Sequence, residues 1–282
     1  MTAPDFVVVG HVTRDLVADG WRPGGSPSFS AVQAHRLGCT VGVVTRTAGD
    51  VDLAALLPFA QIVDAGSPVT TTFENVYHDG VRTQHIRAVA KAIEAGDVPP
   101  DWLAAPTVLL GPVFGEVAPG FASLFDASSR VGVDAQGWLR AADADGSVRH
   151  TPWRGEPFWI GASALFVSDE DLAGDEEQLA RWIAGVPIVA MTESWRGARV
   201  HADGHWRRMD SFPETEVDPT GAGDTFGTGF LIRLHETGDV GEAARFGAAA
   251  ASLSVGGIAA TAIPSRAEVE ARMRQYPDIA LR

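Results

Sequence analysis

Residues 218–230 read Asp-Pro-Thr-Gly-Ala-Gly-Asp-Thr-Phe-Gly-Thr-Gly-Phe, and this stretch is the most informative part of the chain. Pro219 predicts a turn, and Gly221 and Gly223 allow backbone geometries that other residues avoid. A helix is expected over residues 224–234. A glycine-rich turn that opens a helix leaves backbone N–H groups unpaired, and with the helix dipole they form an anion site. The stretch therefore predicts a phosphate-binding turn that needs no lysine.

Asp224 lies in the first turn of that expected helix, beside the anion site. A carboxylate there would repel a resting phosphate, so its position needs a reason. One interpretation is a general base, which accepts the proton of a substrate hydroxyl as phosphate is transferred. The other is an ordinary N-terminal helix carboxylate, which the helix dipole stabilises.

Short apolar runs alternate with helix-like segments along the rest of the chain, which predicts an α/β fold with a parallel sheet. Ligands of such sheets bind at the carboxyl ends of the strands. No repeat or long linker divides the chain, so residues 1–282 are expected to form one domain. Strands are expected at 6–10, 41–45, 107–111, 131–134, 164–167 and 187–192, and helices at 28–37 and 175–184.

One segment departs from this alternation. Residues 69–78 and 81–87 are rich in β formers and flank Asp79-Gly80, which predicts a hairpin. Neither face of the hairpin is purely apolar, so we interpret residues 67–90 as a lid over a wet site. Part of residues 11–25 is a further candidate segment of this lid. A plain edge hairpin is the alternative, since the alternation alone is ambiguous.

Composition excludes several classes of function. The chain has 22 Lys and Arg against 36 Asp and Glu, a net charge of −14. That balance disfavours nucleic-acid binding and attachment to a membrane surface through basic residues. Lys91 is the single lysine, so no Walker A loop is present, and the single Cys39 excludes an intrachain disulfide. The N-terminus lacks the features of a signal peptide, so a cytoplasmic protein is expected.

The order of these motifs resembles the ribokinase-like (PfkB) carbohydrate kinases over nearly the whole chain. Residues 218–224 look like the second signature of that family, and Gly24-Gly25 resembles the di-glycine of the first signature. Residues 9–15 are similar to the first strand and its substrate-binding aspartate, which would be Asp15. The resemblance implies a ribokinase-like fold with a mostly parallel central sheet, flanking helices and a small β lid. It also implies an ATP-dependent kinase that phosphorylates an alcohol.

The resemblance also implies roles for individual residues. Asp224 would be the base, and the amides of Gly221, Ala222 and Gly223 would hold the transferring phosphate. Residues 24–29, 71–74 and 133–140 look most like the myo-inositol kinase branch, so a polyol or sugar is the expected substrate, with myo-inositol the leading candidate. Arg140 would pair with a phosphate, or would be an ordinary surface arginine. The residues expected to bind substrate are Asp15, Gly25, Phe29, Glu74, Gln136 and Arg140.

ATP and Mg²⁺ are the cofactors that the resemblance implies, with the metal carried mainly by the nucleotide phosphates. Adenine is expected between the segment after Thr192 and the small-residue helix 248–254. The Asn-x-x-Glu motif of the family is altered here to Ser-Asp-Glu-Asp at 168–171; we assign Glu170 to the metal shell, and Asp171 is the alternative. A monovalent cation beside Asp218 and Thr220 is a further candidate. The residues expected to bind the nucleotide are Thr192, Gly197, Thr220, Gly221 and Gly223.

Three alternatives remain open at this point. A nucleoside or ribose kinase would stack a base on Phe29 and Phe73, and a sensor would bind sugar and ATP with little turnover. A nicotinamide oxidoreductase is disfavoured, because the glycine run misses Gly-x-Gly-x-x-Gly and lies far from the first strand. His11 is a candidate substrate contact. Lid hairpins can pair between copies, so a homodimer is a candidate assembly.

Overall fold

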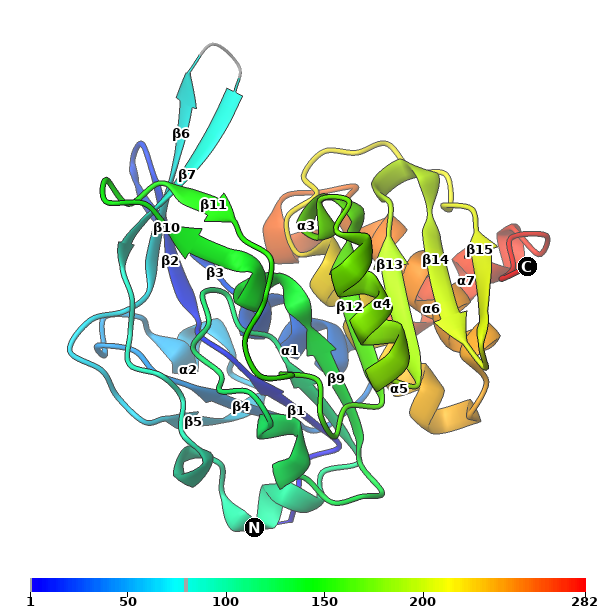
Figure 1. Cartoon of the computed structure of the whole chain (residues 1–282), viewed down its shortest axis with the longest axis horizontal. Coiled ribbons are helices and arrows are strands. Elements are labelled where there is room, and N and C mark those ends of the chain that lie inside the picture. Colours follow the sequence, from blue (N-terminus) through cyan, green and yellow to red (C-terminus); the bar gives the residue numbers. More distant parts are fainter. Residues whose placement is uncertain (1, 79–80) are drawn as a thin grey trace.

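The computed structural model describes residues 2–78 and 81–282, so the turn expected at Asp79-Gly80 lies outside the described residues. Nine strands form the main sheet: β1 (Phe6–Val9), β4 (Val41–Thr45), β5 (Ala60–Asp64), β8 (Thr107–Leu110), β9 (Arg130–Asp134), β12 (Ala164–Ser168), β13 (Ile188–Thr192), β14 (Ala198–Ala202) and β15 (His205–Met209). Their order is β15-β14-β13-β12-β9-β8-β1-β4-β5, and all neighbours are parallel except in the β13-β14-β15 meander (Figure 1). The six predicted strands are therefore confirmed as parallel members of one sheet.

Two helical layers cover the main sheet. Side chains of β1 alternate between them: Phe6 and Val8 join one core cluster, and Val7 and Val9 join the other. Both faces are thus buried, which explains why these strands read as continuous apolar runs. The first face carries α1 (Ser26–Arg36), α5 (Ala222–Thr237), α6 (Val240–Ser254) and α7 (Arg266–Gln275); the second carries α3 (Asp169–Leu172) and α4 (Glu176–Gly185), and α2 (Leu53–Leu56) precedes β5.

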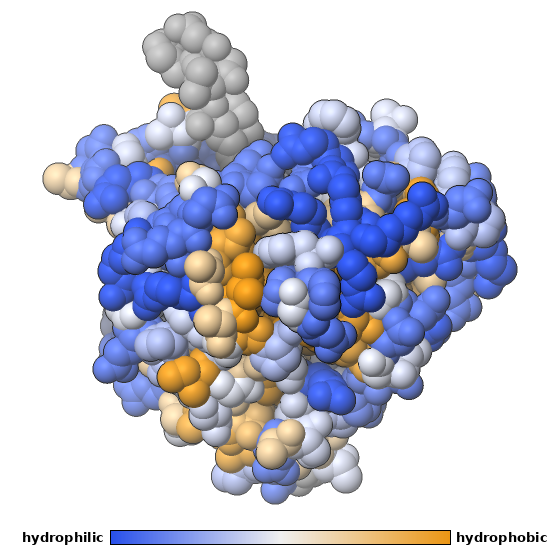
Figure 2. All heavy atoms as spheres, turned by 45° about the vertical axis from the view of Figure 1, so that its right-hand side comes forward, coloured by the Kyte–Doolittle hydropathy of each residue, from blue (hydrophilic) through white to orange (hydrophobic). Residues whose placement is uncertain are grey.

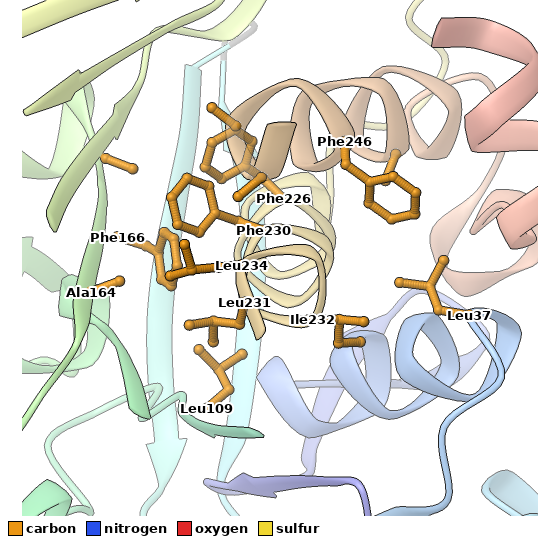
Figure 3. Close-up of a cluster of buried hydrophobic side chains, with 14 of the residues drawn as sticks. Leu37, Leu109, Ala164, Phe166, Phe226, Phe230, Leu231, Ile232, Leu234 and Phe246 are labelled. Carbon is orange, nitrogen blue, oxygen red and sulfur yellow. The ribbon is translucent and has the colours of Figure 1, made fainter. Parts of the chain in front are cut away.

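The longest helix, α5, lies against the middle of the sheet. Its Phe226 and Phe230 rings pack edge-on against Phe166 of β12, with centroid separations of 6.1 and 5.5 Å (Figure 3). Leu231 of α5 reaches toward Leu109 of β8 in the same cluster. This packing fixes the start of α5, where the glycine-rich turn lies, at the carboxyl ends of β9 and β12.

A second, smaller sheet projects from the carboxyl-terminal edge of the main sheet (Figure 1). It contains β2 (Thr13–Val17), β3 (Gly20–Gly24), β6 (Thr72–His78) and β7 (Val81–Ala88) in the order β3-β2-β6-β7. The hairpin of β10 (Arg140–Ala142) and β11 (Val148–His150) lies beside it, through a bridge between His85 and Ser147. We call the four-stranded sheet the lid. It combines the hairpin of residues 67–90 with the segment 13–24.

The face drawn in Figure 2 is largely hydrophilic, with apolar residues in separate groups. Within the described residues, no helix has the length and apolar character needed to cross a membrane.

Candidate active site

A cavity of about 420 Å³ lies between the lid, the carboxyl ends of β9 and β12, and the start of α5. We call it the acceptor cavity. Most of the predicted site residues line it, although they come from opposite ends of the chain. These residues are Asp15, Gly25, Phe29, Gln136, Arg140, Glu170, Thr192, Thr220, Gly221, Gly223 and Asp224.

Packing against Phe29 and hydrogen bonds to Asp218 hold the glycine-rich turn in place. Gly221 has a φ of +80°, and a Cβ atom there would lie 2.2 Å from Cδ1 of Phe29. Asp218 accepts hydrogen bonds from the N–H groups of Thr220 and Ala259, both at 3.0 Å. Burial alone would raise the pKa of Asp218, but these hydrogen bonds hold it below its usual value. Asp218 is therefore a charged brace of the turn.

One of the three amides predicted to hold the phosphate has an acceptor within the turn. The Ala222 N–H donates to the carbonyl of Pro219 at 3.1 Å. The N–H groups of Gly221 and Gly223 have no acceptor among the described residues. The phosphate-binding role of the three amides stays a prediction, and Gly221 and Gly223 are the two whose hydrogens are free in this structure.

The Asp224 carboxyl faces the acceptor cavity from the first turn of α5. Its Oδ1 atom is inaccessible to solvent and has no hydrogen-bond partner among residues 2–78 and 81–282. Burial raises the pKa of Asp224 to about 6, although a hydrogen bond with Ser26 and the charge of Arg140 act in the opposite direction. A carboxylate with a weakly solvated, unpaired oxygen and a raised pKa is a competent proton acceptor near neutral pH.

Asp134 is a second acidic residue in the same cavity, at the end of β9. Its Oδ1 accepts a hydrogen bond from the Gln136 N–H at 3.2 Å, which shapes the turn that carries Gln136. Burial, followed by the negative charge of Asp224, raises the pKa of Asp134 to about 8. Sequence reasoning gave Asp134 no role. The available signal was an aspartate at a strand end two residues before Gln136.

The raised pKa of Asp134 predicts a pH-dependent gain in stability for Asp134→Asn. Because the folded state binds this proton more tightly than an unfolded chain with pKa 3.8 does, stability falls as pH rises from about 4 to about 8. Asparagine removes that loss and can still accept from Gln136. We expect Tm at pH 8 to rise by at least about 2 °C, the shift that about 1 kcal/mol produces at this size, with the gain vanishing near pH 4.

The control is Asp145→Asn. The Asp145 carboxylate is fully exposed and accepts hydrogen bonds from Ser147, which lower its pKa, so its replacement should not stabilise the protein at pH 8. Melting curves measured by circular dichroism from pH 4 to 9 would decide the matter. A gain for Asp134→Asn that is equal at pH 4 and pH 8 would contradict the assignment.

The opposite wall of the cavity comes from the lid and from the segment after β9. Thr13 donates to Asp15 at 2.9 Å, and a Cβ atom at Gly24 would lie 2.3 Å from Asp15 Oδ2, so this glycine leaves room for the carboxylate. Arg140 donates to the carbonyl of Val113 at 3.2 Å. Its guanidinium lies over the Phe73 ring, 5.9 Å from the centroid. Arg140 is therefore half-buried in the site and is not an ordinary surface arginine.

Two predicted substrate contacts lie elsewhere. Glu74 does not line the cavity; its carboxylate forms an ion pair with Arg87 on the neighbouring lid strand, with N···O 2.6 Å. His11 is completely buried and lines neither this cavity nor the second one described below. The sequence placed His11 near the substrate strand and Glu74 on the lid hairpin, but it gave no direction for their side chains.

A second cavity of about 410 Å³ adjoins the first, and we call it the donor cavity. The two share Glu170, Thr192 and Gly223 in their linings. Gly197 and Ala222, both predicted site residues, line the donor cavity. Its walls are the segment after Thr192, including Trp195, and the small residues of α6, which are Ala248, Ala251 and Ser252. This is the region in which the sequence predicted adenine.

The acidic segment 168–171 lies between the two cavities. Asp171 accepts a hydrogen bond from the Ser168 hydroxyl at 2.6 Å, and Asp169 pairs with Arg196. Glu170 is exposed and has no ion pair or hydrogen bond in the described part of the chain. Among the two candidates for the metal shell, Glu170 is thus the uncommitted one. No group of three metal-binding side chains occurs in the residues described.

Comparison with known proteins assigns this site to a family. A family model described as pfkB family carbohydrate kinase matches residues 162–266, which include the glycine-rich turn and Asp224. An inositol 3-kinase of Oryza sativa subsp. japonica is 31% identical over 253 residues, which cover 81% of this chain and 62% of that protein. Residues 162–266 therefore form a pfkB carbohydrate kinase domain, and the chain is similar to kinases of that family over most of its length. It is a phosphotransferase that acts on hydroxyl groups.

Other proteins similar to this chain act on or bind different compounds. A cytidine kinase of Thermococcus kodakarensis is 28% identical over 265 residues, covering 86% of this chain and 93% of that one. A solved pyrophosphate-dependent kinase of the ribokinase family, complexed with a pyrophosphate analog and myo-inositol, has a TM-score of 0.78 and 21% identity, covering 94% and 99%. Arabidopsis thaliana ribokinase, complexed with ribose and ATP, has a TM-score of 0.73 and 21% identity, covering 97% and 99%. These likenesses establish the ribokinase fold.

Proposed function

We propose that this pfkB-family kinase transfers the γ-phosphoryl group of ATP to a hydroxyl of a polyol, with myo-inositol the leading candidate. The observation that carries the proposal is the acceptor cavity itself. Asp224 and the free amides of Gly221 and Gly223 lie on one side of it, and Asp15 and Gln136 lie on the other. Carboxylate and amide groups hold vicinal hydroxyls in fixed geometry, which is what a cyclic polyol presents.

The geometry supports a direct transfer. Asp224 takes the proton of the acceptor hydroxyl, the freed oxygen forms a bond to the γ-phosphorus, and the bond to the β-phosphate oxygen breaks to leave ADP. Gly221 and Gly223 donate hydrogen bonds to the transferring phosphoryl oxygens. Glu170 would hold a nucleotide-bound magnesium ion through water, and the metal would supply neutralisation of the phosphate charge. A monovalent cation beside Asp218 stays a prediction, as does a homodimer paired through the lid.

The donor cavity favours a nucleotide over pyrophosphate. Trp195, Phe212, Ala248 and Ala251 line it, and a purine can pack against these apolar or small side chains, whereas pyrophosphate has no apolar part to place there. ATP as donor also fits the cytoplasmic location that the sequence predicts.

A nucleoside kinase is the second candidate, since the cytidine kinase similarity favours it. Each of the two aromatic rings offered for base stacking already has a neighbour of the chain against it, although both rings line the acceptor cavity. Phe29 lies beneath Gly221, and Arg140 covers the ring of Phe73. This arrangement favours a polyol. The sensor alternative has no support in the geometry of Asp224, which points into a complete cavity.

A substrate panel tests the proposal. ADP release would be measured with myo-inositol, ribose, fructose, adenosine and cytidine as acceptors, and with ATP or pyrophosphate as donor. We expect kcat/KM for myo-inositol with ATP to exceed that for cytidine by about 10²-fold or more, because a site built to bond hydroxyls discriminates strongly. A larger kcat/KM for a nucleoside would overturn the polyol assignment. If none of the acceptors in the panel is phosphorylated, the result would support the sensor.

A further inference from the structure

A buried cluster joins both ends of the lid hairpin to the main sheet. His11 follows β1, Thr71 precedes β6, and Ala90 and Lys91 follow β7. The Thr71 hydroxyl contacts His11 Nδ1 at 2.8 Å, and His11 Nε2 contacts the Lys91 carbonyl at 3.0 Å. The Ala90 N–H donates to the Thr71 hydroxyl at 2.9 Å. We call these four residues the hinge cluster.

Every polar atom of the His11 and Thr71 side chains has a partner. A carbonyl oxygen can only accept, so His11 Nε2 carries a hydrogen and donates to Lys91. Nδ1 shares a hydrogen bond with the Thr71 hydroxyl, which also accepts from Ala90, and the Glu116 carboxylate lies 3.9 Å from Nδ1. Both ring nitrogens and the hydroxyl are fully used. His11 and Thr71 are completely buried, so loss of one group leaves another unsatisfied away from water.

The hinge cluster connects to the acceptor cavity through Glu116. This buried carboxylate accepts hydrogen bonds from the N–H groups of His11 at 2.9 Å, Val113 at 2.9 Å and Phe114 at 2.8 Å. The Val113 carbonyl in turn accepts from Arg140, which lines the acceptor cavity. The backbone of His11 and the position of Arg140 are thus linked by consecutive hydrogen bonds.

The lid hairpin contributes its own residues to the acceptor cavity. Phe73 of β6 and Gln84 of β7 line it, whereas the lining of the donor cavity contains no described residue of 67–90. Phe73 also packs edge-on against Phe114, with centroids 6.4 Å apart. The hinge cluster therefore lies where a change in hairpin angle would alter the acceptor site and leave the donor site as it is.

We propose that His11 and Thr71 are positioning residues, which hold the lid hairpin at both of its ends and thereby set the geometry of the acceptor site. The role rests on the proposed function for its choice of acceptor. It goes beyond that function, because neither residue contacts the acceptor cavity. The hairpin closes over the acceptor and excludes water only while both ends are held, so the hinge cluster also separates transfer from hydrolysis of the donor.

Thr71→Val tests the role, because valine keeps the shape of the side chain and removes the hydroxyl. We expect KM for myo-inositol to rise about tenfold, as for a buried polar group left unsatisfied, with KM for ATP unchanged. ADP release without acceptor should increase relative to phosphoryl transfer. Thr71→Ser retains the hydroxyl and should restore the wild-type values. Equal rises in both KM values, or the same behaviour of the valine and serine variants, would overturn the proposal.

Hydrogen–deuterium exchange keeps the test independent of the acceptor. In Thr71→Val, amides of residues 72–88 should exchange faster, and those of β12 in the main sheet should be unchanged. Unchanged exchange of the hairpin would overturn the hinge role. Failure of the wild-type protein to phosphorylate any polyol, with faster hairpin exchange in the variant, would instead reject the proposed substrate and support the hinge.

Discussion

Asp224→Asn is expected to lower kcat by about 10²–10⁴-fold, the contribution of a general base, while ATP affinity stays close to that of the wild type. Asparagine matches the carboxylate in size and can still interact with Ser26, so the start of α5 should keep its structure. It cannot take the proton of the acceptor hydroxyl. Steady-state kinetics by coupled ADP release would measure the loss, and calorimetric titration of ATP would show that binding persists.

The pH profile distinguishes this role from a purely electrostatic one. Because burial raises the pKa of Asp224 to about 6, kcat of the wild type should fall as pH drops below about 6. The residual kcat of Asp224→Asn should not show this fall at low pH. Asp134→Asn is the matched control, since it removes a carboxylate from the same cavity and keeps the base. Parental turnover in Asp224→Asn, or a larger loss in the control, would contradict the assignment of the base.

Local sequence patterns were sufficient for the main sheet and for the turn. The run Phe6–Val9 predicts a buried parallel strand because both of its faces are apolar, and the structure buries both. The turn at 218–223 was predicted because proline and glycine restrict or relax the backbone locally. The helix α5 begins at Ala222, two residues before the predicted start at Asp224. Such features depend on residues close in sequence.

Side-chain direction was the part that sequence could not supply. The Glu74 carboxylate reaches Arg87 because the β6–β7 register places their strands side by side. The Ala222 N–H donates to the Pro219 carbonyl because of the particular turn that forms. Asp134 acquires its raised pKa only when folding buries it and brings Asp224, 90 positions later in the sequence, to the same cavity. Each of these outcomes depends on contacts between distant segments.

In the lid, one pairing of strands was predictable from local sequence and another was not. The β-prone runs on either side of 79–80 predicted a hairpin, and β6 and β7 pair as expected. The parallel pairing of β2 with β6, which brings Asp15 opposite Phe73, depends on where β1 ends in the main sheet. Local alternation cannot fix that register, because the two strands are far apart in sequence.

Gly221→Ala is expected to lower kcat/KM by about 10²–10³-fold, the effect of losing one donor to the transferring group. The new Cβ would lie 2.2 Å from Cδ1 of Phe29 at a φ of +80°, so the turn must move and its two free amides lose their common direction. Stability should fall as well, by about 1–3 kcal/mol from overpacking. Coupled kinetics and thermal melting of the same preparations would measure both effects.

Gly238→Ala is a control that introduces a Cβ atom at a positive φ without a steric clash. Gly238 ends the same helix with a φ of +68°, and a Cβ there meets nothing within 4 Å. This variant should lose about 1 kcal/mol of stability from the left-handed backbone and keep its activity. Phe29→Ala combined with Gly221→Ala should lose less stability than the sum of the two single changes, because the ring that blocks the Cβ is gone. Additive losses would mean that the clash does not govern the turn, and activity in Gly221→Ala equal to wild type would remove the turn from the phosphate site.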